Sequence, residues 1–176
     1  TVMADKSILE DLRDQDEFSS KGYGAWEIGS HFESPPYIVK GVLDEGETTT
    51  IYGASQTLKS FVALDMLMHV SSGMPWHGFK VHKTAVLIVL GEGAGSYPKR
   101  IYAWLKSHSM FGLPKDISPW LWVNPDPVDL HNAPEMIAGL VNEASEAIGQ
   151  PVKLVLIDTL STNLGEGADE NSTGHM

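Results

Sequence analysis

The sequence predicts an α/β domain with a mainly parallel β-sheet flanked by helices, and three observations lead to this fold class. Strand patterns alternate with helical patterns from residue 37 onward, which is the order of elements in a parallel sheet with right-handed crossovers. The strand pattern at 84–90 is a continuous apolar run, and the one at 152–157 is largely apolar, as expected for parallel strands buried on both faces. The length of 176 residues, 42% of them hydrophobic, suits one globular core.

The first 36 residues differ from the rest of the chain. They are polar and acidic, and they end in Ser34-Pro35-Pro36, where two prolines prevent helix formation and favour an extended path. We therefore expect an N-terminal extension at residues 1–36 and a folded domain at residues 37–176.

The first strand and the first helix of the domain are expected between residues 48 and 75. Residues 48–52 are β-branched and aromatic and are bounded by glycines, which favours a short strand. Residues 60–69 read as a helix that ends before Gly73 and Pro75. The apolar side chains of this helix that share one stripe are Phe61, Leu64 and Met68.

The remaining elements alternate along the chain. The apolar run at 84–90 is a strand, and residues 98–108 form a helix with a proline in its first turn. Residues 121–123 form a brief strand. Residues 133–148 carry two adjacent apolar rows at helical spacing, which predicts an amphipathic helix. The last predicted strand covers residues 152–157.

Composition and charge exclude several classes of protein. The formal net charge of −11 disfavours general coating of nucleic acid or of an anionic membrane. The chain has no cysteine, which excludes disulfides, thiolate metal sites and cysteine nucleophiles. No stretch approaches the roughly 18 apolar residues of a membrane span, and the start of the chain does not resemble a signal peptide. These features predict a soluble protein of the cytoplasm.

The strongest chemical signal is a segment between the predicted strand at 48–52 and the following helix. It reads Gly53, Ala54, Ser55, Gln56, Thr57, Leu58, Lys59, Ser60. This is nearly a phosphate-binding P-loop, whose backbone amides surround a phosphate while the lysine reaches the β and γ oxygens. The hydroxyl after the lysine is a ligand of Mg²⁺, and the helix directs its positive end at the phosphates.

One position of this loop departs from the motif, because Leu58 stands where the second glycine belongs. A Cβ there could crowd the phosphate or alter the turn. The alternative interpretation of the segment is a plain connection between a strand and a helix, without a ligand.

Two carboxylates at strand ends favour the functional interpretation. Asp158 follows the apolar strand at 152–157, where a P-loop ATPase needs a carboxylate for the Mg²⁺ shell. Glu92 follows the strand at 84–90, where it could orient or deprotonate the attacking water. Ligands of open α/β sheets bind outside the carboxyl ends of the strands. We therefore expect the loop, Glu92 and Asp158 to converge.

From about residue 37 to residue 176, the chain resembles the RecA-like P-loop ATPases. It is most similar to the hexameric replicative helicases of the plasmid and phage RepA type, with an AAA-type ATPase domain. The matching pieces, in order, are YIVKGVL, GASQTLKSF, SSGMPWHGFKV, VLIVLGEG, LVLIDTL and DENSTGHM.

The resemblance implies roles for individual residues. Lys59 and Ser60 would bind the phosphates and Mg²⁺. Glu92 would be the catalytic carboxylate, and Asp158 would be the metal residue of the second strand. Arg100, which follows Glu92 by eight positions, would face the nucleotide or a neighbouring subunit. The alternative for Arg100 is a solvated side chain or a local ion pair.

The resemblance also implies the wider function: hydrolysis of ATP with Mg²⁺ by a homo-oligomeric ring that acts on DNA, in a plasmid- or phage-associated bacterial setting. The DNA would be single-stranded and would bind through regions largely absent from this sequence. Such folds continue past the Asp158 strand into further strands, whereas this sequence ends at Met176. We therefore expect a C-terminally incomplete domain with one unpaired sheet edge.

Two other functions stay open at this point. Leu58 makes a nucleotide-binding module without hydrolysis credible. A small-molecule P-loop kinase would need an arginine-rich lid, and the chain has only 12 lysines and arginines in all. A zinc site is not expected, because His69, His77 and His82 lack the spacing of a zinc-binding helix. No metal other than Mg²⁺ is proposed.

Overall fold

The computed structural model describes residues 25, 35–54, 56–91, 94–114, 118–130 and 135–163. The chain divides into two compact units, Thr1–Pro36 and Tyr37–Met176. The elements below all belong to the second unit.

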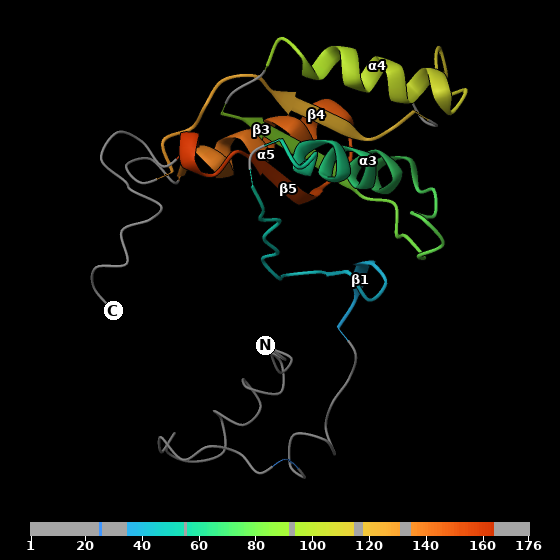
Figure 1. The fold of residues 1–176 in the computed structure, drawn as a ribbon, viewed down its shortest axis with the longest axis horizontal. Coiled ribbons are helices and arrows are strands. Elements are labelled where there is room, and N and C mark those ends of the chain that lie inside the picture. The colour runs from blue at the N-terminus through green and yellow to red at the C-terminus, as the bar shows by residue number, and fades with distance from the viewer. Residues whose placement is uncertain are drawn as a thin grey trace. The chain divides into compact units, whose positions relative to one another are not determined.

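A three-stranded parallel sheet forms the centre of this unit (Figure 1). Its strands are β3 (Ala85–Leu90), β4 (Leu121–Asn124) and β5 (Val152–Asp158), in the order β4-β3-β5. All six residues of β3 are buried, which explains its continuous apolar sequence. The predicted parallel sheet is therefore confirmed. Among the described residues, β5 pairs with β3 alone.

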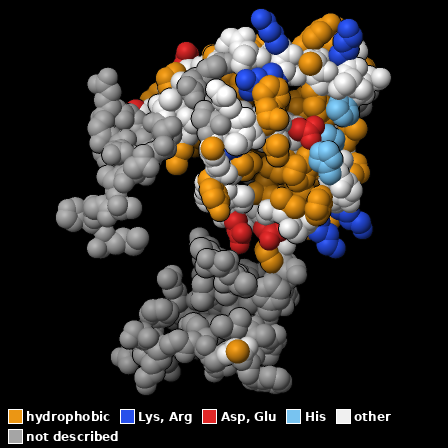
Figure 2. All heavy atoms as spheres, viewed as in Figure 1, with side chains coloured by type: hydrophobic (Ala, Val, Ile, Leu, Met, Phe, Trp, Pro, Cys, Tyr) orange, Lys and Arg blue, Asp and Glu red, His pale blue; other side chains and the backbone are white. Residues whose placement is uncertain are grey.

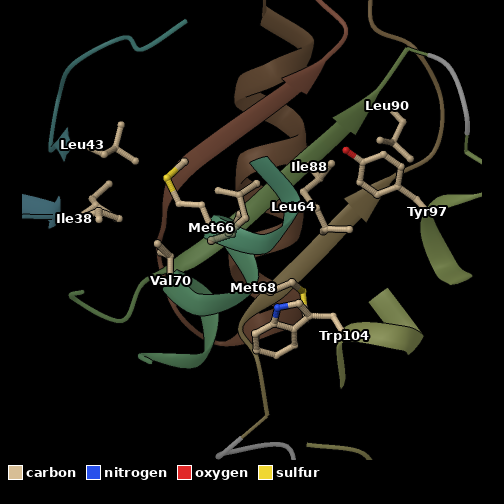
Figure 3. Close-up of a cluster of buried hydrophobic side chains, with 13 residues drawn as sticks. Ile38, Leu43, Leu64, Met66, Met68, Val70, Ile88, Leu90, Tyr97 and Trp104 are labelled. Atoms are coloured by element: carbon tan, nitrogen blue, oxygen red, sulfur yellow. The ribbon is translucent and has the colours of Figure 1, made fainter. Parts of the chain in front are cut away.

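Helices cover both faces of the sheet. α3 (Lys59–Ser72) and α4 (Tyr97–Ser107) pack on the face that carries alternate β3 side chains, namely Val86, Ile88 and Leu90 (Figure 3). α5 (Glu135–Ile148) packs on the opposite face, because successive side chains of a strand point to opposite sides. Each fully buried Leu, Ile or Val contributes roughly 1.5–3 kcal/mol of burial free energy. These two layers hold the strand ends in place.

The boundaries of α3 follow from its sequence. Gly73 has left-handed backbone angles, and its N–H donates to the Val70 carbonyl oxygen at 3.2 Å. Glycine adopts this conformation without steric cost, so the predicted stop signal at Gly73 is confirmed. The helix runs to Ser72 and is therefore longer than the predicted 60–69. Leu64 and Met68 of the predicted stripe are buried, whereas Phe61 is 49% exposed.

The other helices follow the sequence pattern closely. α4 begins one residue before Pro98 and ends one residue before His108. α5 begins at Glu135, and residues 133–134 of its predicted span lie outside the described part of the chain. No helix in the described part of the chain has the length and apolar character that a membrane span requires.

The predicted strand at 48–52 is wrong. Residues 47–53 have no regular secondary structure, and Tyr52 is 90% exposed. A β-branched sequence forms a strand only where a neighbouring strand accepts its hydrogen bonds and its side chains pack. The described sheet has no strand that pairs with this segment. Local propensity alone is insufficient here.

A short hairpin was not predicted from the sequence. It consists of β1 (Tyr37–Val39) and β2 (Leu43–Asp44), which pair antiparallel. Ile38 and Leu43 belong to the same hydrophobic cluster as the buried side chains of α3. The His82 N–H donates to the Ile38 carbonyl oxygen at 2.9 Å. Strands of two and three residues carry too few side chains to show a period of two.

A polar network around Asp65 joins α3, α4 and the loop after α3. The indole N–H groups of Trp76 and Trp104 each donate to the Asp65 carboxylate at 2.9 Å. His77 lies 3.2 Å and His69 lies 3.5 Å from carboxylate oxygens of Asp65. On the face shown in Figure 2, histidine side chains lie among hydrophobic ones. Within the described ranges, no group of three or more His, Cys, Asp or Glu residues could hold a metal ion.

Candidate functional site

The loop before α3 closes on its own lysine. The Lys59 Nζ donates to the Gly53 carbonyl oxygen at 2.8 Å and to the Ala54 carbonyl oxygen at 2.9 Å. The Thr57 Oγ1 also donates to the Ala54 carbonyl oxygen, at 2.8 Å. Gln56 has a positive φ of 65°, and Ser55 lies outside the described residues. The ammonium group thus occupies the loop that the sequence assigns to phosphate.

Leu58, which stands where the motif has its second glycine, has a backbone conformation that favours glycine. Its φ and ψ are 64° and 19°, in the left-handed region, and it is the residue that caps the start of α3. Left-handed backbone costs an ordinary L-residue roughly 1–2 kcal/mol. The leucine side chain has no polar atom that could cap the helix, and the residue is 62% exposed. Burial of the leucine therefore does little to offset the cost of its left-handed backbone.

Ser60 and Asp158 meet at the carboxyl end of β5, although they are 98 positions apart in the sequence. The Ser60 Oγ donates to Asp158 Oδ1 at 3.1 Å. The convergence of loop and strand end that the sequence predicts is present in this pair. Both side chains are half-buried.

Tyr97 is a site residue that the sequence analysis missed. Its hydroxyl donates to Asp158 Oδ2 at 2.6 Å, and the residue is only 2% exposed. Burial raises the pKa of the Tyr97 hydroxyl above its usual range, and the hydrogen bond to the Asp158 carboxylate raises it further. The phenol therefore keeps its proton at neutral pH and acts as a hydrogen-bond donor to Asp158. Its only signal in the sequence is its position at the start of a helix.

Arg100 lies over the first turn of α3. The centre of its guanidinium is 4.3 Å from the centroid of the Phe61 ring and 5.4 Å from that of Tyr97. Such cation–π contacts contribute about 0.5–1 kcal/mol at exposed sites. The sequence left Arg100 between a nucleotide-facing role and a local interaction, and the structure records this local aromatic contact.

Gly91, which follows β3, and the segment after β5 support the backbone at Asp158. The Gly91 N–H donates to the Asp158 carbonyl oxygen at 2.8 Å. A Cβ on Gly91 would lie 1.9 Å from Thr162 Oγ1, so glycine is required there by close packing. Asn163 is fully buried, and its side chain accepts a hydrogen bond from the Val128 N–H at 2.8 Å. Gly91 and Asn163 are structural residues of this site that the sequence did not reveal.

Glu92 lies outside the described residues, so its predicted role stays a prediction. The strand that precedes it ends at the same edge of the sheet as Asp158, because Leu90 is the register partner of Asp158.

The side chains at this edge fit a hard divalent cation. Mg²⁺ prefers oxygen ligands and is usually held by one or two protein groups, with substrate phosphates and waters completing the shell. The Ser60 hydroxyl and the Asp158 carboxylate supply such oxygens within 3.1 Å of each other. Nothing in this donor set favours a softer metal.

A family model described as an AAA domain matches residues 24–176, which is most of the chain. The match begins ahead of residue 37, where the motif series in the sequence starts. No curated protein and no solved structure matches the chain.

Proposed function

Since the chain belongs to the AAA domain family, a family of ATPase-type nucleotide-binding domains, we propose that it binds Mg-ATP at residues 53–60 and hydrolyses it. The observation that carries this proposal is the 3.1 Å contact between Ser60 Oγ and Asp158 Oδ1. It brings the hydroxyl of the loop and the carboxylate of the neighbouring strand end to one place. P-loop nucleotide sites hold Mg²⁺ with such a pair of groups.

Binding of the nucleotide starts with a rearrangement of Lys59. The ammonium group exchanges the carbonyl oxygens of Gly53 and Ala54 for oxygens of the β- and γ-phosphates. The first bonds of α3 run from the Phe61 and Val62 N–H groups to the Leu58 carbonyl oxygen, so the N–H groups ahead of them have no carbonyl of the helix to bond. The first turn of α3 contains no acidic residue. This end of the helix therefore favours an anion. When bound, Mg²⁺ would supply positive charge that neutralises the phosphate oxygens.

Hydrolysis is an in-line attack of a water oxygen on the γ-phosphorus, with breakage of the bond to the bridging oxygen of ADP. We assign Glu92 the role of orienting this water and accepting its proton. Lys59 stabilises the charge that develops on the phosphate oxygens.

The work driven by hydrolysis is, in this proposal, movement on single-stranded DNA by a RecA-like ring of the replicative-helicase type. The support is the ordered series of motifs, which ends with LVLIDTL and DENSTGHM. With a net charge of −11, the chain repels polyanions at long range, so DNA contacts must be local.

A second function, a nucleotide-binding module without hydrolysis, is favoured by one observation. Leu58 is held in a left-handed conformation beside a loop that is closed on Lys59. If the leucine keeps the phosphates from their productive position, binding persists without turnover.

An ATPase assay on the complete protein, with and without single-stranded DNA, separates the two functions. We expect hydrolysis that depends on Mg²⁺ and increases with DNA. Nucleotide binding without turnover in both conditions would favour the module and overturn the motor.

A further inference from the structure

Tyr97 is placed between the hydrophobic core and the candidate metal site. It is the first residue of α4, and its ring belongs to the core cluster between α3 and β3, where Figure 3 shows it beside Leu90. A buried tyrosine hydroxyl requires a hydrogen-bond partner. The partner is Oδ2 of Asp158, at 2.6 Å. Core packing therefore fixes the ring, and the ring fixes a hydroxyl against the carboxylate.

The two oxygens of Asp158 are held by different elements. Oδ2 accepts from Tyr97 of α4 at 2.6 Å, and Oδ1 accepts from Ser60 of α3 at 3.1 Å. With Oδ2 engaged by a rigid donor, the carboxylate cannot rotate freely about its last side-chain bond. Oδ1 is thereby directed to the side on which the P-loop hydroxyl lies.

We infer that Tyr97 is a positioning residue for the Asp158 carboxylate, and that its hydroxyl prepares Oδ1 and Ser60 to receive the Mg²⁺ that accompanies the nucleotide. This inference rests on the proposed function and deepens it. Partners of metal ligands typically change metal affinity by about 10–100-fold when they are removed. The expected effect is therefore on the Mg²⁺ requirement, not on the recognition of the phosphates by Lys59.

A purely structural role for Tyr97 makes a different prediction. If the hydroxyl only needs a partner for burial, its removal changes the stability of the fold and leaves the Mg²⁺ dependence of nucleotide binding unchanged. The variant Tyr97→Phe separates these roles, because it keeps the ring in the core and removes only the hydroxyl.

The experiment measures ADP binding to the full chain by calorimetry, at a series of Mg²⁺ concentrations and in the presence of EDTA. For Tyr97→Phe we expect the Mg²⁺ concentration at half-maximal effect to rise by about tenfold or more, with metal-free affinity close to that of the wild type. The matched control is Tyr102→Phe on the same helix, where the residue is 50% exposed. This control should leave both quantities unchanged.

Asp158→Asn distinguishes failure of the inference from failure of the proposed function. If Asp158→Asn removes the Mg²⁺ effect while Tyr97→Phe behaves as the wild type, the positioning role is wrong and the proposed site stands. If Asp158→Asn leaves the Mg²⁺ effect intact, the proposed metal site is wrong, and the inference falls with it. Should Tyr97→Phe not fold, Tyr97→Met removes the same hydroxyl with an adaptable apolar side chain, and the same results decide.

Discussion

Replacement of Leu58 by glycine or by alanine tests the left-handed backbone of the loop. Both variants lose the leucine side chain beyond Cβ, and they differ from each other only in whether Cβ is present. Leu58 has a φ of 64°, which costs an L-residue roughly 1–2 kcal/mol. Leu58→Gly relieves that cost. It also lowers the free energy of unfolding by about 0.5–1 kcal/mol, because glycine has a greater backbone entropy in the unfolded chain. Leu58→Ala keeps the strained conformation.

The free energy of unfolding should therefore be about 0.5–1 kcal/mol higher for Leu58→Gly than for Leu58→Ala. Relative to the wild type, Leu58→Gly should lie within about 1 kcal/mol, since the lost contacts of a side chain that is 62% exposed offset the relieved strain. Equilibrium urea unfolding of the full chain measures both differences. An alanine variant as stable as the glycine variant would refute the left-handed assignment.

The same pair of variants informs the nucleotide site. If the Cβ of Leu58 hinders the approach of phosphate, Leu58→Gly binds ATP more tightly than the wild type, and Leu58→Ala does not. Weaker binding by Leu58→Gly would show instead that the leucine is part of a working loop.

Three further changes test other parts of the site and fold. Glu92→Gln in the complete protein should keep ATP binding and lower turnover by roughly 10²–10⁴-fold; an unchanged rate would remove Glu92 from its catalytic role. Gly91→Ala should destabilise the fold by about 1–3 kcal/mol in urea unfolding, because its Cβ would meet Thr162 Oγ1, whereas Gly95→Ala, which has open space around it, should not. Burial alone would raise the pKa of Asp65, but hydrogen bonds from Trp104 and Trp76 and the nearby His69 and His77 hold this pKa below its usual 3.8. The unfolded chain then binds the proton more readily, so this contribution to stability is present above about pH 4 and is lost at lower pH. Asp65→Asn should therefore reduce the fall of the free energy of unfolding as the pH is lowered through this range.

Local patterns in the sequence were sufficient for most of the regular elements. The run that became β3 is apolar throughout because both of its faces are covered, by α3 and α4 on one side and α5 on the other. The helix signals at Gly73 and Pro98 act through the backbone of their own turns, so they could be recognised without the fold.

Features that depend on contacts between residues distant in the sequence are harder to predict from local sequence patterns. The segment at 48–52 has strand propensity and no pairing strand in the described sheet, so its prediction failed. The Ser60 and Asp158 pair could be anticipated, because carboxyl ends of parallel strands gather at one edge of a sheet. The Tyr97 contact could not be anticipated, because it depends on how α4 packs against β3.

The most direct test of the nucleotide site is a calorimetric titration of Mg-ATP into the full chain and into Lys59→Ala. Loss of the ammonium group removes charge-assisted hydrogen bonds of about 1.5–3 kcal/mol, so the affinity of Lys59→Ala should fall by roughly 10–100-fold. The control Lys106→Ala, at an exposed position near the end of α4, should bind as the wild type does. Equal affinity of the wild type and Lys59→Ala would contradict the assignment of residues 53–60 as the nucleotide site.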